Sequence, residues 1–365
     1  MRRIIIANTY YQLLLSVQLK FSLFKNDEVF LLFSDHSKNA ENIVNNIKKY
    51  HLFEHVKFIR SKNLVYSNSR LTSYLNLIKC ILFRKSIFSF YLKGINNLNI
   101  DEILYFNPFL DVECLYIELS KYNPQIRLSM FEEGLLSYSS PEINLHPGKV
   151  IKLLHFFCRK IYKINIYDSF YNFYCYFPEL YQSNKFNSVR VPLITPKSKT
   201  ANYLLRIFKI DKDQLDYHQK YIFFTSVYDF EGEPIGEFEL VTKIAQFVGK
   251  DNLLIKQHPR DLRTIYRDNG FVVDVNSSIP WEVIQLVGNF ENKVYLTVNS
   301  GSVLCANTLS SQNIKVVYMY KFCNYTANPS CVCNIHDLSD ILNNIHMKSI
   351  LHSVYIGESF DDIRQ

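Results

Sequence analysis

Glycine and proline are scarce in this chain of 365 residues, which contains 10 of the first and 11 of the second. Since these residues dominate turns and flexible linkers, long unstructured connections are not expected. No apolar run reaches the roughly 18 to 20 residues that crossing a bilayer requires, so no membrane-spanning segment is expected. Positive charge is only mildly in excess, with 41 Lys and Arg against 34 Asp and Glu, and its spread along the chain does not by itself indicate nucleic-acid binding.

Glycine-rich nucleotide motifs are missing as well. No G-x-G-x-x-G or Walker-type loop follows a candidate strand, which argues against the common dinucleotide and P-loop sites. No Asp-x-Asp pair is positioned as a metal clamp. Asp229 and Glu231 have a similar spacing, but they are not an aspartate pair and we expect them in a surface loop.

Eight cysteines are scattered through the chain. Because the sequence opens with Met1-Arg2-Arg3 and continues directly into an apolar, strand-like run, we expect no signal peptide and reduced thiols in a cytoplasmic protein. A structural zinc site is the alternative, since thiolates and imidazole form closed zinc sites. Its candidate ligands are Cys323, Cys331, Cys333 and His336.

Short apolar runs of strand length alternate with stretches of helix length in both halves of the chain. A hydrophobic content of 48% with 21% charged residues is typical of a globular protein, and the length favours two domains. The candidate strands are residues 4–7, 29–33, 56–59, 103–106, 126–130, 221–224, 253–255, 271–273, 294–298 and 316–320. This alternation predicts the α/β class, with two doubly wound parallel sheets that face each other across a cleft.

The domain boundary is predicted near Ile207, with an N-terminal domain at residues 1–206 and a C-terminal domain at residues 207–365. Residues 149–215 show no clear strand rhythm, so we expect helices and the interdomain connection there. Ligands of doubly wound sheets bind at the carboxyl ends of the strands. Polar residues that follow candidate strands are therefore the candidates for a site.

Two glutamates and a glycine, Glu132, Glu133 and Gly134, follow the candidate strand at residues 126–130. The glycine permits a sharp turn. Repulsion between adjacent acids and partial burial raise the pKa of a carboxyl group, which suits a general base acting on a hydroxyl. An ordinary exposed strand end accounts for the same residues.

A basic residue and a histidine follow the candidate strand at residues 253–255, in the order Lys256-Gln257-His258-Pro259-Arg260. Pro259 disfavours a helical conformation at His258. A histidinium at this position would hydrogen-bond or protonate a phosphate leaving group, with Lys256 or Arg260 adding charge. A histidine that only caps the strand is the alternative.

Two further motifs are typical of helix beginnings. Pro280 and Glu282 suit a first helical turn, where Glu282 would accept hydrogen bonds from ribose hydroxyls. Residues 299–302, Asn-Ser-Gly-Ser, stand between a strand and a predicted helix, whose N-terminal N–H groups would receive a phosphate or carboxylate. A helix-dipole effect and an N-cap without a ligand are the respective alternatives.

In this order, the four motifs resemble those of bacterial sialyltransferases of the GT-B type, which have two Rossmann-like domains. The nearest similarity is to the family of lipooligosaccharide and streptococcal capsule sialyltransferases (glycosyltransferase family 52-like). Residues 8–13, Asn-Thr-Tyr-Tyr-Gln-Leu, are similar to that family's polar first-strand loop, which faces the acceptor. The similarity spans both halves and is one of pattern only outside the motifs. Relatives carry paired serines, whereas Gly301 separates Ser300 from Ser302 here.

The resemblance implies roles for individual residues. Glu132 is the first candidate for the general base and Glu133 the second, and His258 would stabilise or protonate the departing cytidine monophosphate. Glu282 would hold the ribose and Ser300 the phosphate. The other implied nucleotide-binding residues are Lys256, Pro259, Asn299, Gly301 and Ser302. The implied acceptor-binding residues are Asn8, Thr9, Tyr11 and Gln12.

The implied reaction is an inverting, metal-independent transfer of sialic acid from CMP-sialic acid to a terminal sugar hydroxyl of a bacterial surface glycan, in lipooligosaccharide or capsule. No cofactor is expected, because the leaving group is a monophosphate and the family offers His and Ser in place of a divalent ion. The expected partners are the nucleotide-sugar donor and a lipid-linked glycan acceptor, and no nucleic acid. A related GT-B transferase with a hexosyl donor and a non-catalytic GT-B partner protein are the alternatives.

Two basic, apolar stretches, residues 77–93 and 149–163, have two interpretations. They would lie on an anionic membrane surface, where a lipid-linked acceptor is found, or form core-facing helices with a solvated basic face. The expected location is therefore the cytoplasm, with peripheral contact to the inner face of the cytoplasmic membrane left open.

Overall fold

The chain divides into two compact units in the computed structural model. The N-terminal unit comprises residues 1–133 and 140–192, and the C-terminal unit comprises residues 193–365 together with the short segment 134–139. The structure describes residues 1–37, 39–61, 72, 75, 78–79, 84–106, 110–138, 153, 156, 160, 169–181, 183, 185–210, 215, 217–276, 279–309, 312–326, 329–344 and 353–364.

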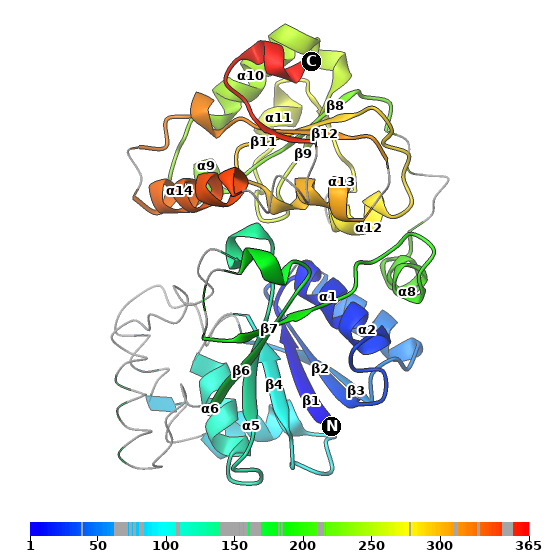
Figure 1. The fold of residues 1–365 in the computed structure, drawn as a ribbon, viewed down its shortest axis with the longest axis vertical. Coiled ribbons are helices and arrows are strands. Elements are labelled where there is room, and N and C mark those ends of the chain that lie inside the picture. The colour runs from blue at the N-terminus through cyan, green and yellow to red at the C-terminus, as the bar shows by residue number, and fades with distance from the viewer. Residues whose placement is uncertain are drawn as a thin grey trace. The chain divides into compact units, whose positions relative to one another are not determined.

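A parallel sheet with the strand order β3-β2-β1-β4-β5-β6-β7 forms the centre of the N-terminal unit (Figure 1). Its strands are β1 (Arg2–Ala7), β2 (Glu28–Ser34), β3 (His55–Ile59), β4 (Glu102–Tyr105), β5 (Arg127–Phe131), β6 (Phe170–Cys175) and β7 (Asn187–Arg190). In the central strand β1, Ile4 pairs with Phe30 on one side and with Ile103 on the other. Both faces of this strand are buried, as its run of aliphatic residues predicts.

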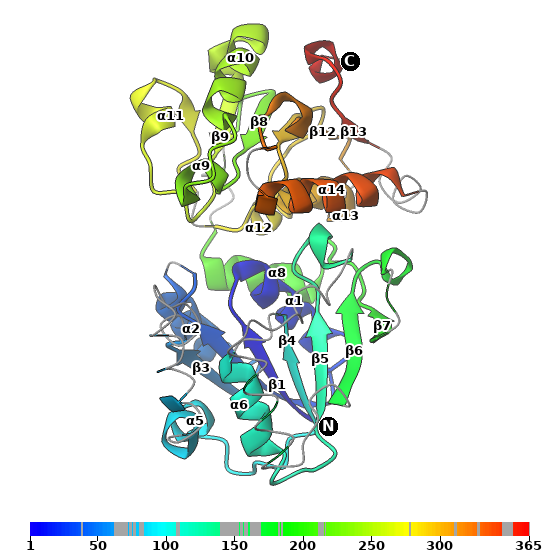
Figure 2. The same cartoon turned by 90° about the vertical axis from the view of Figure 1, so that its left-hand side faces the viewer.

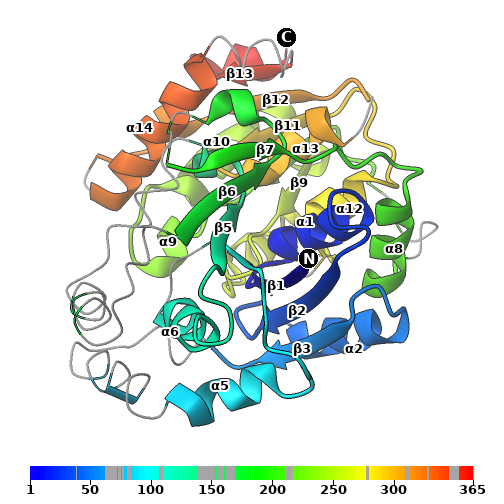
Figure 3. The same ribbon diagram turned by 60° about the horizontal axis from the view of Figure 1, so that its bottom comes forward.

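Helices cover both faces of this sheet. They are α1 (Tyr10–Phe21), α2 (Ala40–Lys49), α5 (Arg84–Leu92) and α6 (Leu110–Leu119), with a short 3-10 turn at η5 (Pro178–Leu180). The 3-10 turn η1 (Leu135–Ser137) belongs to the C-terminal unit. The strand order reverses between β1 and β4. Right-handed crossovers therefore place α1 and α2 on one face and α5 and α6 on the other, an arrangement that can be followed in Figure 3.

The C-terminal unit has its own parallel sheet, in the order β10-β9-β8-β11-β12-β13. Its strands are β8 (Tyr221–Phe224), β9 (Leu253–Lys256), β10 (Val272–Val273), β11 (Val294–Thr297), β12 (Lys315–Tyr318) and β13 (Val354–Ile356). The order reverses between β8 and β11, the point at which ligands bind in such sheets. The predicted α/β class with two doubly wound parallel sheets is confirmed.

Both α-helices and short 3-10 turns connect the strands of the C-terminal sheet (Figure 2). The helices are α8 (Lys199–Phe208), α9 (Tyr228–Glu231), α10 (Glu237–Val248), α11 (Ile265–Asp268), α12 (Trp281–Gln285), α13 (Cys305–Thr308) and α14 (Pro329–Asn343). The 3-10 turns are η7 (Lys250–Asn252), η8 (Gly301–Leu304), η9 (Tyr320–Phe322) and η10 (Phe360–Ile363).

Two features of the chain differ from the sequence-based expectation. The division between the units falls after Pro192, so the predicted boundary after residue 206 lies inside α8, which packs against α12 of the C-terminal unit. The prediction of helices and a connection for residues 149–215 is wrong where β6 and β7 lie. The polar residue within β6, Asn172, is tolerated because its amide pairs with Tyr174 Oη at 2.9 Å and with Asn187 at 3.2 Å.

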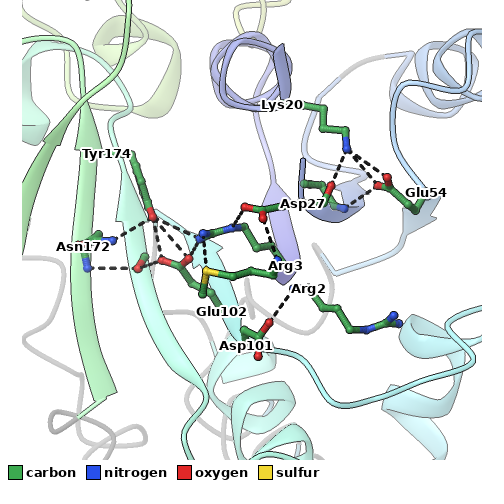
Figure 4. Close-up of polar contacts among 12 residues, drawn as sticks. Arg2, Arg3, Lys20, Asp27, Glu54, Asp101, Glu102, Asn172 and Tyr174 are labelled. Carbon is green, nitrogen blue, oxygen red and sulfur yellow. Dashed lines mark hydrogen bonds and ion pairs between the residues drawn. The ribbon is translucent and has the colours of Figure 1, made fainter. Parts of the chain in front are cut away.

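A buried polar network lies near the amino ends of the N-terminal strands (Figure 4). Arg3 of β1 forms an ion pair with Glu102 of β4, whose side chain is 0% exposed. Glu102 also accepts hydrogen bonds from Ser129 of β5 and, at 3.2 Å, from Tyr174 of β6. Buried charges are stable only when they are paired and hydrogen-bonded, and here four strands supply the partners.

Candidate active site

The two glutamates of the Glu132-Glu133-Gly134 motif lie at the carboxyl end of β5. Glu132 is 3% exposed. Its Oε1 accepts a hydrogen bond from the Tyr11 hydroxyl at 2.5 Å, and its Oε2 accepts one from the Tyr176 backbone N–H at 2.7 Å. Glu133 is half-buried, and its Oε2 accepts a hydrogen bond from Gln12 Nε2 at 2.6 Å. The neutral groups that donate these hydrogen bonds stabilise the carboxylate form of both glutamates.

The predicted acceptor-binding residues form the turn that leads from β1 into α1. Thr9 caps the helix, since its hydroxyl accepts a hydrogen bond from the Gln12 N–H at 3.2 Å. Gln12 Oε1 accepts the Asn8 N–H at 2.6 Å, which directs the amide nitrogen of Gln12 toward Glu133. Tyr11 and Gln12 therefore contact the two glutamates through hydrogen bonds. Asn8 and Thr9 contact Gln12 instead.

Tyr176 is a site residue that the sequence analysis missed. It follows β6, and it contributes its backbone N–H to Glu132 across a sequence separation of 44 residues. Arg190 of β7 binds the same residue through the following peptide group, because its Nη1 donates to the Tyr176 carbonyl at 3.1 Å. The sequence carries no signal for this contact, because it depends on the pairing of β5 with β6, and β6 was not predicted as a strand.

His258 follows β9 at the carboxyl edge of the C-terminal sheet. Its backbone N–H donates to Thr225 Oγ1 at 2.9 Å, and its Nδ1 accepts the Arg260 backbone N–H at 3.1 Å. Burial, together with the nearby Arg260 charge, lowers the pKa of His258 to about 4. The ring is therefore neutral at pH 7, not the expected histidinium, and its proton lies on Nε2, which serves as a hydrogen-bond donor. Thr225 was missed, although a polar Thr-Ser pair directly after a candidate strand is a usable signal.

Lys256 is buried, and all three of its donors are engaged within the C-terminal unit. Its Nζ donates to Asp274 Oδ2 at 2.7 Å and to the carbonyls of Asn276 and Ile279 at 3.1 and 3.3 Å. It thus fixes the segment that leads into α12 and Glu282, whereas the sequence predicted direct contact with the nucleotide. Pro259, also predicted to bind nucleotide, is exposed beside His258.

Glu282 and Ser302 lie together in the structure, although 20 residues separate them in the sequence. Glu282, in the first turn of α12, is 6% exposed. Burial raises the pKa of its carboxyl, and a hydrogen bond from the Ser302 side chain opposes that shift. Two of the predicted nucleotide-binding residues therefore share one site in the C-terminal unit.

Residues 299–301 form the turn after β11. Asn299 Nδ2 donates to the hydroxyl of Tyr228, a residue that the sequence analysis missed, at 2.9 Å, and the Ser300 N–H donates to Thr297 Oγ1 at 2.9 Å. The predicted helix after this turn is instead the 3-10 turn η8 followed by the four-residue α13. A Cβ atom at Gly301 would lie 3.6 Å from the Leu135 backbone nitrogen in the same unit, which is an ordinary van der Waals contact, so space alone does not require glycine at this position.

Asp229 and Glu237 form a buried acidic pair near the end of β8. Asp229, expected in a surface loop, lies in the short helix α9 and accepts the Ile235 and Glu237 backbone N–H groups at 2.7 and 3.2 Å. Glu237 is 0% exposed, and its Oε1 accepts the Ser226 N–H at 2.8 Å. Among the described residues, its Oε2 has no hydrogen-bond partner. Burial raises the pKa of Glu237 to about 8.

Glu237→Gln is expected to stabilise the C-terminal unit at alkaline pH. Between its ordinary pKa and about 8, Glu237 is protonated when folded but ionised when unfolded, so the folded state binds more protons. The free energy of unfolding therefore falls as pH rises through this window, by at most about 1.4 kcal/mol per pH unit. The glutamine variant removes this slope, so at pH 8 it is expected to be more stable than the wild type by up to about 4 kcal/mol.

Urea unfolding at several pH values, followed by the fluorescence of Trp281, measures this effect. The chain has one tryptophan, and it is buried in the C-terminal unit. Glu239→Gln, in the same helical turn but exposed, is the matched control. Equal slopes for the wild type and both variants would show that Glu237 is ionised in the folded protein.

The described part of the chain contains no cluster of three or more His, Cys, Asp and Glu side chains that could hold a metal ion. The four residues of the alternative zinc site are all described, and they form no such cluster: Cys323, Cys331, Cys333 and His336. None of the helices described has both the length and the apolar character of a bilayer span. Of the two basic stretches, residues 149–163 lie largely outside the described residues. Much of the first stretch is described and forms α5, in which Phe88, Tyr91 and Leu92 are buried.

The two doubly wound parallel sheets define the GT-B fold. Solved structures share this fold. The α/β-galactoside α-2,3-sialyltransferase of the luminous marine bacterium Photobacterium phosphoreum is 13% identical, with a TM-score of 0.50 over 99% of each chain. The GT-B domain of a sialyltransferase from Photobacterium damselae is 12% identical, with a TM-score of 0.50 over 98% of this chain and 100% of that one.

The family follows from a second comparison. Residues 3–321 match the model of the family described as alpha-2,8-polysialyltransferase (POLYST), and the chain belongs to this family. No curated protein is significantly similar to the chain. The predictions of a glycosyltransferase of the sialyltransferase class and of the GT-B fold are thereby confirmed.

Proposed function

We propose that the protein is an inverting sialyltransferase that uses CMP-sialic acid as donor and the terminal sugar hydroxyl of a bacterial surface glycan as acceptor. We further propose that the glycan is a lipid-linked lipooligosaccharide or capsule chain, as in the glycosyltransferase family 52-like relatives that the motifs resemble. The enzyme then works at the inner face of the cytoplasmic membrane. Family membership supports the sialyl transfer. The chemistry of the strand ends supports the CMP-sialic acid donor and the inverting displacement, and the resemblance of the motifs supports the acceptor.

The observation that carries this proposal is the division of chemical roles between the two sheets. The carboxyl edge of the N-terminal sheet presents hydrogen-bonded carboxylates, Glu132 and Glu133, which suit removal of a proton from an attacking hydroxyl. The carboxyl edge of the C-terminal sheet presents the Nε2–H of His258 and the Glu282–Ser302 pair. These groups suit a monophosphate leaving group and a ribose, respectively.

Inversion follows from a single displacement. The acceptor hydroxyl attacks the anomeric carbon of sialic acid while Glu132 takes its proton, with Glu133 as the second candidate for this role. The bond to the CMP phosphate breaks on the opposite face of the sugar, and His258 and Ser300 stabilise the charge that develops on the phosphate oxygens. Because the phosphate brings negative charge to His258, donor binding raises the pKa of this imidazole.

Nucleotide binding tests the proposed donor. CMP is expected to raise the melting temperature, and UDP to leave it unchanged. A second experiment follows the Cε1–H signals of the histidines by NMR as the pH is changed. We expect one imidazole with a pKa of about 4, and we expect CMP to raise this pKa by at least about one unit. The His258→Asn variant assigns that signal. Release of CMP from CMP-sialic acid in the absence of acceptor completes the test.

The two alternatives give different results in these measurements. Protection by UDP without protection by CMP would point to a hexosyl donor. A folded protein that binds neither nucleotide would be a non-catalytic GT-B partner. Either result would contradict the proposed function.

A further inference from the structure

The Tyr11 hydroxyl and the Glu132 carboxylate form a direct hydrogen bond between α1 and the end of β5. The donor is a neutral phenol, and the bond to Oε1 measures 2.5 Å. The second carboxylate oxygen is held by a backbone group, the N–H of Tyr176, at 2.7 Å. Two donors from two elements therefore fix the plane of this carboxylate, and one of them is a side chain that mutation can remove.

We propose that Tyr11 is a positioning residue that orients Glu132 and keeps it ionised, and not a ligand of the acceptor sugar. This inference rests on the proposed function, in which Glu132 is the base. A hydroxyl that donates to a carboxylate stabilises the charged form, and an aromatic side chain on a capped helix is a rigid support for it. A carboxylate oxygen has more than one lone pair, so it can accept a hydrogen bond and still take the proton of the attacking hydroxyl.

The charges around Glu132 make Tyr11 more important. Glu133 follows it in the chain and disfavours a second negative charge close by. Cys175 of β6 also faces Glu132, and burial together with this carboxylate raises the pKa of its thiol, so that it stays neutral. The nearest cation from β7, Arg190, is paired with Glu179 at 2.6 Å. The hydrogen bonds from Tyr11 and Tyr176 therefore help to hold the Glu132 charge.

Tyr11→Phe keeps the ring and removes the donor. We expect the acidic limb of the kcat/KM profile to move to higher pH by about one unit, because Glu132 loses a hydrogen bond to its charged form. We expect kcat at the plateau to fall about tenfold through loss of orientation, while the acceptor KM stays within about twofold. Incorporation of 3-fluorotyrosine at position 11, a stronger donor, should move the limb in the opposite direction.

A double-mutant cycle separates failure of this inference from failure of the proposed function. If Tyr11 acts through Glu132, then Tyr11→Phe has no further effect on turnover in a Glu132→Gln background. Tyr122→Phe, at an exposed tyrosine of the same unit, is the control and should leave the profile unchanged. An unmoved acidic limb with a tenfold higher acceptor KM would make Tyr11 an acceptor ligand and overturn the inference. Near-normal turnover by Glu132→Gln alone would instead overturn the assignment of the base.

Discussion

Replacement of Glu132 by glutamine should lower sialyl transfer by about 10²–10⁴-fold, the range that a general base contributes. The variant should still fold. Tyr176 donates its N–H to the glutamine Oε1, and the Tyr11 hydroxyl, which is both donor and acceptor, turns to accept from Nε2. The loss is therefore chemical and appears in kcat, with little change in the affinity for CMP. Steady-state turnover and CMP titration together measure both quantities.

Glu133→Gln is the matched control, because it makes the same chemical change in the neighbouring residue. Glu133 is half-buried and accepts a hydrogen bond from the amide of Gln12, and we expect a loss of about tenfold or less if Glu132 is the base. A larger loss of turnover in Glu133→Gln than in Glu132→Gln would identify Glu133 as the general base. Equal and small losses in both variants would show that neither carboxylate removes the acceptor proton.

The positions of the site motifs could be predicted because they depend on local rules. Strands such as β1 and β11 are buried on both faces, and their aliphatic runs identify them without knowledge of their partners. Polar residues that follow such strands lie at the ligand-binding edge of a parallel sheet by topology alone. The strand-end positions of Glu132, His258 and Ser300 were predicted in this way, before any strand order was known, and their roles stay predictions.

The partners of these residues could not be predicted in the same way. The hydrogen bond between Tyr11 and Glu132 joins residues that are 121 positions apart. Tyr176 follows β6, a strand that was missed although its aromatic residues are typical of strands, and whose apolar run is interrupted by Asn172. Lys256 illustrates the same limit. A lysine at the end of a strand is predicted to bind phosphate. In the structure the Lys256 ammonium is buried and donates to Asp274 and to two backbone carbonyls.

Arg3→Met should destabilise the N-terminal unit by about 3–5 kcal/mol, the range for breaking a buried ion pair. The methionine fills much of the space of the arginine stem but leaves Glu102 charged at 0% exposure. Ser129 and Tyr174 still donate to Glu102 (Figure 4), and they are neutral. Far-UV circular dichroism during urea unfolding measures the change, while Trp281 fluorescence reports the C-terminal unit separately.

The preceding residue of the same strand offers a matched control. Arg2 also pairs with a glutamate, Glu28, whose side chain is 52% exposed, so Arg2→Met should change stability by no more than about 1 kcal/mol. The double variant Arg3→Met/Glu102→Gln should recover part of the loss, because it removes the unpaired buried charge together with its partner. If Arg2→Met and Arg3→Met were equally stable, the buried pair would contribute no more than a surface pair. The polar network would then be replaceable by apolar packing without loss of the fold.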